Sequence, residues 1–496
     1  MQINPEVLRN YWLSFSVHRM IIAPIVMLAI IFLIFKGAQV KGDFNWNKSD
    51  VAPYAAAMMT SIVLYCFIIF VWGGYSAAGA VLGQINDKTW DYQRLSSISP
   101  WSLSWGTVFG STLFVWYCAI TSLAFAFFYA NFFLPLNVIL QGMFVLLAGG
   151  IYTILVVSLI GLQALQTSDR SGKRRSIGYR LLGIIIGLNM LSYTISLLPF
   201  QDVTAFVNPG TNQFVTELNI KFYGFEIPIR SFFITSMLIF SLWAFFGVYR
   251  TMRTELQMRS TPWGWTVFLL FLFFYFGNFS FQSGTVWQNE AQSFSLLNPV
   301  NIGSVNLDYF FSIAFGISLL SCYVMFFSDH LSITRYRMLQ HRLARGQLMR
   351  AAELIPRMAI SYLFALIAGL VLIILNPSVS VKSNFIPAFL TLAALLLFTL
   401  RDIAILHYFS LARDNRRAFL ATIFYLAILY YLLPLLFFSV GIRSYSFFYP
   451  PIFTTNWQDL IPILLQLAAV FILIYLRWQS AYEPIKQQTQ ATQQAA

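Results

Sequence analysis

The sequence predicts an all-α, polytopic integral membrane protein with about 12 transmembrane helices in two parallel six-helix repeats. Three observations support this fold class. The 496 residues are 58% hydrophobic and only 10% charged, unlike those of a soluble globular protein. The apolar residues form blocks long enough for a helix to cross a hydrocarbon core of about 30 Å at about 1.5 Å per residue. The loops between the blocks also repeat one order of lengths in the two halves of the chain.

The expected spans follow one another along the whole chain. They are Met20–Phe35, Tyr54–Tyr75, Trp105–Asn131, Leu136–Leu162, Tyr179–Leu198, Pro228–Val248, Trp263–Asn278, Leu307–Phe327, Met358–Leu375, Phe385–Ile405, Ala418–Val440 and Leu460–Leu476. No cleavable signal is expected before the first of them, because Met1–Arg19 is too polar and too long for a leader.

The basic residues indicate the orientation. With the N-terminus inside, only seven of the 31 Lys and Arg fall in outer segments: Lys36, Lys41, Lys48, Lys221, Arg230, Lys382 and Arg443. Basic residues are retained on the cytoplasmic side, so both termini are expected to be cytoplasmic, in a plasma membrane such as the bacterial inner membrane. The net charge of +13 is therefore a topology signal, and no nucleic-acid partner is expected.

The two halves of the chain are expected to form two units. Residues 1–249 and 250–482 each hold six spans, and residues 483–496 are expected to be a disordered polar tail. A basic amphipathic segment precedes each half, Leu8–Met20 and Tyr249–Trp265, as expected of a helix lying in the membrane interface. Because six is even, both halves start on the same side, which makes the repeats parallel.

The residues inside the spans give few signs of chemistry. Cys66, Cys118 and Cys322 lie within expected spans and are interpreted as packing residues. No metal site is expected, because the four His residues do not cluster. An intramembrane enzyme would need a catalytic set within the spans, and none is seen.

Charged and small residues near the spans lead to two further expectations. Asp308, Arg401 and Asp402 are expected at span ends, where they reach water, which argues against ion coupling. Two pairs of glycines have the spacing that lets helices approach closely, Gly79 with Gly83 and Gly183 with Gly187.

The most unusual segment is the inner loop between the second and third spans. Its apolar residues recur at intervals of three and four, which predicts an amphipathic helix parallel to the membrane. These residues are Val81, Leu82, Ile85, Thr89, Tyr92, Leu95 and Ile98. Pro100 is expected to end this helix, and Trp101 and Trp105 to mark re-entry into the membrane.

Three interpretations of this loop are open. It is an interfacial anchor, the signature loop of a secondary transporter of the major facilitator type, or the docking site of a partner. The facilitator pattern is matched only in its first half, by Gly83–Lys88, because Trp90, Asp91 and Tyr92 lack its glycine and basic pair.

The third interpretation rests on the run NDKTWDYQRLSSISP, Asn86–Pro100, followed by Gly106. This run resembles the cytoplasmic loop of ABC export permeases of the second type. The resemblance implies a coupling helix that docks on a separate cytoplasmic ABC ATPase subunit, present in two copies. The residues it assigns to this interface are Asp87, Lys88, Thr89, Trp90, Asp91 and Arg94.

The corresponding loop of the second half has the same place and length but not the motif. It is rich in arginine and is interpreted as a diverged second docking segment, with interface residues Arg337, Arg342, Arg345 and Glu353. A solvated or lipid-facing basic helix remains an alternative, since cations are the default on inner loops.

The chain is not expected to be an enzyme. It has no Gly-x-x-x-x-Gly-Lys-Ser/Thr pattern, and the nearest run, SGKRRS at Ser171, lacks the first glycine and the hydroxyl. The resemblance therefore implies a transport subunit that binds no cofactor, with ATP and Mg²⁺ bound by the partner. The 50 Phe are compatible with a hydrophobic or lipid-linked substrate, but they fit lipid-facing packing equally well.

Overall fold

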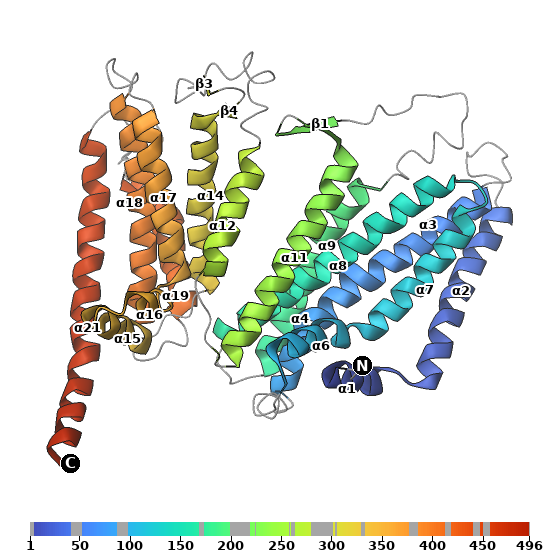
Figure 1. The fold of residues 1–496 in the computed structure, drawn as a ribbon, viewed down its shortest axis with the longest axis horizontal. Helices are drawn as coiled ribbons and strands as arrows, with labels where there is room; N and C mark the ends of the chain where they lie inside the picture. Colours follow the sequence, from blue (N-terminus) through green and yellow to red (C-terminus); the bar gives the residue numbers. More distant parts are fainter. Residues whose placement is uncertain are drawn as a thin grey trace. The chain divides into compact units, whose positions relative to one another are not determined.

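The fold is all-α and consists of two compact units (Figure 1). The computed structural model describes residues 4–40, 52–86, 98–167, 173–198, 219–223, 225–256, 258, 263–278, 301–302, 305–328, 333–375, 385–411, 418–439, 447–449 and 457–495. The first unit contains Met1–Ile220 and Glu226–Ser260, and the second contains Lys221–Phe225 and Thr261–Ala496. The main division thus lies after residue 260, eleven residues beyond the expected division after residue 249.

The helices of the first unit follow the expected apolar blocks. In chain order they are α1 (Pro5–Ser14), α2 (Val17–Val40), α3 (Ala52–Cys66), the π-helix η1 (Phe67–Gly73), α4 (Gly74–Asn86), α6 (Pro100–Ser111), α7 (Leu113–Ala130), α8 (Leu136–Thr167), α9 (Lys173–Ser196) and α11 (Ile229–Glu255).

The second unit is also built mainly of helices. Its helices are α12 (Trp263–Gly277), α14 (Leu307–Ser328), α15 (Ile333–Ala344), α16 (Leu348–Ala352), α17 (Arg357–Leu375), α18 (Phe385–Ser410), α19 (Ala418–Ala427), the π-helix η6 (Ile428–Leu432), α20 (Leu433–Ser439), the 3₁₀-helix η8 (Trp457–Leu460) and α21 (Ile461–Ala495).

The described residues contain two small sheets of two strands each. Strands β1 (Asn219–Phe222) and β2 (Phe225–Pro228) pair with each other. Strands β3 (Asn301–Ile302) and β4 (Val305–Asn306) are antiparallel, with Asn301 opposite Asn306.

Within the described ranges, nine helical segments are long and apolar enough to cross a membrane. They are Val17–Gln39, Pro53–Ala80, Leu113–Ala130, Leu136–Gln163, Ile229–Glu255, Arg357–Leu375, Phe389–Ser410, Ala421–Ser439 and Trp457–Ser480. Three shorter apolar helices, Arg180–Ser196, Trp263–Gly277 and Phe310–Met325, lie within expected spans. Length and composition are therefore those of a multi-pass membrane protein.

Buried polar contacts fix the core of the first unit. The Tyr65 hydroxyl of α3 donates to the Leu146 carbonyl of α8 at 2.8 Å, and the Ser122 hydroxyl of α7 donates to the Ser61 carbonyl at 2.7 Å. In a water-free core such hydrogen bonds fix the register of packed helices. The three cysteines are buried and free, in keeping with the packing role expected of them.

Three expected element boundaries are wrong. Pro100 begins α6, where the missing N–H of a first-turn proline costs nothing, and Ser99 caps this helix. Residues 249–255 continue α11 and form no separate interfacial helix, because their apolar residue Met252 is buried in the first unit. Residues 483–495 continue α21, since Gln, Ala and Lys favour helix.

The expectation that Arg401 and Asp402 reach water is also wrong. Both residues lie inside α18 and are only 1% exposed. The helix continues to Ser410, five residues beyond the expected end of the span, so the two charges lie well within it. Each charge is the other's partner, with the Arg401 Nη2 atom 2.8 Å from Asp402 Oδ1.

Candidate docking site

The residues assigned to a partner interface in the first half lie in one stretch between α4 and α6. Asp87, Lys88, Thr89, Trp90, Asp91 and Arg94 all fall within residues 87–97, outside the part of the chain that the structure describes. Both flanking helices are described, α4 up to Asn86 and α6 from Pro100. The geometry of these two helices determines how the stretch is anchored.

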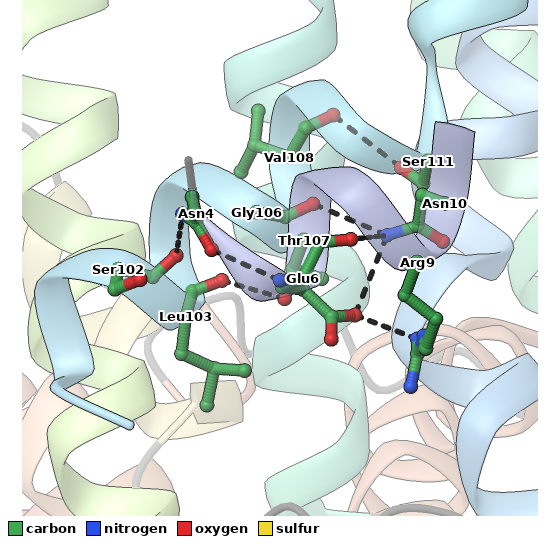
Figure 2. Close-up of polar contacts among 10 residues, drawn as sticks. All are labelled: Asn4, Glu6, Arg9, Asn10, Ser102, Leu103, Gly106, Thr107, Val108 and Ser111. Carbon is green, nitrogen blue, oxygen red and sulfur yellow. Dashed lines mark hydrogen bonds and ion pairs between the residues drawn. The ribbon is translucent and has the colours of Figure 1, made fainter. Parts of the chain in front are cut away.

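Helix α1 holds the beginning of α6 through polar contacts (Figure 2). The Asn4 side chain caps α1 by accepting from the Glu6 N–H at 3.0 Å, and its Nδ2 donates to the Ser102 carbonyl at 2.6 Å. One turn further along, Asn10 Nδ2 lies 3.4 Å from the Gly106 carbonyl. The N-terminal helix is therefore bonded to the first turns after the 87–97 stretch.

A buried carboxylate lies in this contact. Glu6 is 3% exposed, and its Oε1 accepts from Arg9 at 2.6 Å and from Asn10 at 3.3 Å. Two glycines of α6 make the approach of α1 possible. A Cβ added at Gly106 would lie 2.4 Å from the Glu6 Cβ, and one at Gly110 would lie 2.7 Å from Asn10 Nδ2. Side chains at these positions would force the two helices apart.

The other flank of the stretch is held by glycine contacts between α4 and α9. A Cβ added at Gly74 would lie 2.7 Å from the Gly183 carbonyl oxygen, and one at Gly183 would lie 2.6 Å from the Gly74 carbonyl oxygen. The helix backbones therefore touch. Closer to the stretch, the Arg180 side chain lies across Gly79, and its Nη1 donates to the Tyr75 hydroxyl at 2.9 Å.

The loop of the second half forms a helical hairpin, α15 followed by α16. Arg335 closes it, because its Nε and Nη2 donate to the carbonyls of Leu354 at 2.9 Å and Ile355 at 3.2 Å. The Tyr336 hydroxyl lies 2.6 Å from His407 Nε2, which ties α15 to α18. Charge-assisted bonds such as those of Arg335 hold a short hairpin in one conformation.

The four expected interface residues of this hairpin have different environments. Arg342 donates to the Arg350 carbonyl at 2.6 Å and lies 3.8 Å from the Glu353 carboxylate, so these two expected residues pair with each other. Arg345 is exposed next to the turn, while Arg337 is half-buried. Of the four, only Arg345 is thus an exposed residue.

The hairpin has an apolar tip that was not expected from the sequence, which consists of Leu343, Leu348 and Met349. These side chains are 50%, 70% and 86% exposed, and they surround the turn at Gly346. The exposed cations Arg345 and Arg350 flank them. Exposed apolar side chains rimmed by charge are typical of a contact surface. The signal in the sequence was the pair Leu348 and Met349, two residues after Gly346 in a basic loop.

The comparisons with known proteins add no identification. The chain matches none of the protein-family models, and no curated protein sequence is significantly similar to it.

The contact between α1 and α6 is testable by one substitution. Gly106→Ala places a Cβ against Glu6 and is expected to speed amide hydrogen exchange in residues 5–14 by about tenfold, because overpacking costs about 1 to 3 kcal/mol. Gly37→Ala is the matched control, since a Cβ there meets nothing within 4 Å. Equal exchange of α1 in both variants would show that the glycine does not maintain the contact.

Proposed function

We propose that the chain is the transmembrane permease subunit of an ATP-binding-cassette exporter, with twelve spans in two parallel six-span units and the ATPase on a separate subunit. The observation that carries this proposal is the anchoring of the 87–97 stretch on both sides. Helix α6 is bonded to α1, and α4 lies backbone against backbone on α9. A partner that pushes on this stretch would therefore act on α4 and α6, and through them on the helices that pack against them.

The hairpin of the second unit also supports the proposal. The α15–α16 hairpin presents an apolar tip between two arginines, which suits a groove with an apolar floor and acidic rim. We assign Leu348 and Met349 to this contact together with Arg345. Arg342 and Glu353 contribute by holding the hairpin together.

In this proposal the partner subunit, in two copies, binds ATP and Mg²⁺, and the present chain forms the pathway. The inner ends of the spans carry most of the Lys and Arg, which suits cytoplasmic termini and a cytoplasmic ATPase. ATP-driven closure of the ATPase pair would tip the two units between inward-facing and outward-facing states.

Charge reversal in the 87–97 stretch tests the proposal. We expect the triple variant Asp87→Arg, Asp91→Arg, Arg94→Asp to recover at least about tenfold less ATPase than the unaltered chain when each is purified from its native membranes. The reason is that complementary charges on two partners determine how they dock. Lys382→Glu is the control, since it reverses a charge expected on the opposite side of the membrane. Recovery of no ATPase with the unaltered chain, or equal recovery with the triple variant, would overturn the proposal.

A secondary transporter of the major facilitator type is the second candidate. The buried Arg401–Asp402 pair favours it, because charges within spans often mark ion or substrate pathways. Vesicles that contain the purified chain alone decide between the two. Substrate uptake driven by an imposed proton or sodium gradient, without ATP or a second subunit, would support the secondary transporter.

A further inference from the structure

The second unit contains an ion pair inside a candidate span, and the proposed function does not use it. Arg401 and Asp402 are adjacent in α18 and are each 1% exposed. At 1.5 Å per residue, Arg401 lies about 18 Å from Phe389 and about 14 Å from Ser410, the two ends of the candidate span. Charges at such depth are costly and rare, and they generally have a function.

The carboxylate of Asp402 has donors on both oxygens. Oδ1 accepts from Arg401 Nε at 3.1 Å and from Arg401 Nη2 at 2.8 Å. Oδ2 accepts from the hydroxyls of Tyr323 at 2.7 Å and Tyr430 at 2.9 Å. The pair is thus neutral as a whole and is bonded to α14 through Tyr323 and to η6 through Tyr430.

Two residues connect the pair to the segment Phe447–Tyr449, which lies between α20 and α21. Gln466 accepts from Arg401 Nη1 at 2.8 Å, and its Nε2 donates to the Phe447 carbonyl at 2.7 Å. Tyr430 accepts from Arg401 Nη2 at 2.6 Å, and its carbonyl accepts from the Tyr449 hydroxyl at 2.7 Å. Each of the two residues uses one polar group for the ion pair and another for the segment.

The π-helical turn explains how Tyr430 makes both contacts. Tyr430 lies in η6, where the wider turn departs from the i to i+4 bonding of an α-helix. Its carbonyl is available to Tyr449 on one side, while its ring stacks on the Arg401 guanidinium, 5.0 Å from the ring centroid, on the other.

Stability alone does not account for the ion pair. A buried ion pair gives no more stability than apolar side chains of the same volume, whereas its directional bonds fix one arrangement of the helices that share it. In the arrangement that the structure shows, both oxygens of Asp402 already accept from donors of the same unit, so an ion would have to displace one of these donors to bind.

We propose that Arg401 and Asp402 form a polar latch, which holds Phe447–Tyr449 in place through Tyr430 and Gln466. The structure is the closed state of this latch. Loss of either bridging contact releases the segment, while the helices of the second unit stay folded. The proposal rests on these contacts and not on the proposed transport function, so each can fail without the other.

Phe448 provides the probe for the experiment. Its side chain is 1% exposed and packs 5.2 Å from the Phe437 ring and 5.0 Å from the Phe447 ring, measured between centroids. In the full chain in lipid nanodiscs, Phe448→Cys reports release of the segment as its rate of reaction with N-ethylmaleimide. The three native cysteines are buried and are expected to react slowly.

Removing one bridging group should accelerate this reaction. We expect Tyr430→Phe and Gln466→Leu, each combined with Phe448→Cys, to raise the labelling rate by about tenfold or more, since each loses a hydrogen bond to a charged group. Tyr430→Phe keeps the carbonyl that accepts from Tyr449 and removes only the hydroxyl that bonds to the ion pair, so it tests whether the ion pair holds that carbonyl in position. Tyr431→Phe is the matched control, because it deletes the same atom from a neighbouring residue that is 78% exposed. The control is expected to label at the rate of the parent.

Unchanged labelling in both bridge variants, or equal acceleration in the Tyr431→Phe control, would overturn the latch. Where Phe448→Cys already labels as fast as an exposed cysteine, hydrogen exchange of residues 447–449 without the cysteine replaces it. Faster exchange in Tyr430→Phe than in Tyr431→Phe then supports the latch, and equal exchange contradicts it.

Discussion

Asp402→Asn alone is expected to lower the free energy of unfolding by about 3 to 5 kcal/mol, because it leaves the buried Arg401 guanidinium without a counter-charge. Arg401→Gln should have a similar effect, since it leaves the carboxylate charged and buried. The double variant is expected to recover most of this loss, because Gln and Asn are neutral and still bond to each other and to Tyr430. The free energy of unfolding of all three variants is measured by chemical unfolding in detergent micelles.

A double-mutant cycle separates the ion pair from other effects. A coupling energy close to zero between Arg401→Gln and Asp402→Asn would mean that the two charges do not stabilise each other, contrary to the 2.8 Å contact between them. Arg345→Gln is the control for loss of an arginine, since this residue is exposed at the hairpin turn. Its effect on unfolding is expected to be within about 0.5 kcal/mol.

The misplacement of this pair shows what hydropathy can and cannot predict. The apolar run around α18 identifies the helix, but two adjacent charges and His407 look like the end of a span in sequence. The helix continues because His407 Nδ1 bonds to the Ile403 carbonyl at 2.8 Å and Nε2 bonds to Tyr336. The contact with Tyr336 joins residues 71 positions apart and is not encoded in local composition, so the end of the helix could not be predicted from it.

The candidate docking site, too, could be predicted from the sequence only in part. The place of the α15–α16 hairpin between two apolar blocks followed from the sequence alone. The contact of Glu6 with Gly106 did not, because it joins residues 100 positions apart and depends on the angle between α1 and α6. Pro100 could have been identified correctly, since a serine directly before a proline is typical of a helix start.

Two glycines of α9 lie against the backbone of neighbouring helical segments. Gly183 and Gly187 lie one turn apart, as the sequence suggested, and they face different parts of one span. Gly183 meets Gly74 of α4, while a Cβ added at Gly187 would lie 1.9 Å from the Phe70 carbonyl oxygen of η1. The neighbour in both cases is backbone, which cannot rotate away as a flexible side chain can.

Gly187→Ala is therefore expected to destabilise the first unit by about 3 kcal/mol, at the upper end of overpacking costs, because α9 must move away from η1. Gly79→Ala should cost less, since its Cβ meets the Arg180 side chain, which can shift. Gly316→Ala meets nothing within 4 Å and should be neutral or slightly stabilising, because Ala favours helix. Unfolding measured in one detergent ranks the three variants, and equal stability for Gly187→Ala and Gly316→Ala would contradict backbone contact between α9 and η1.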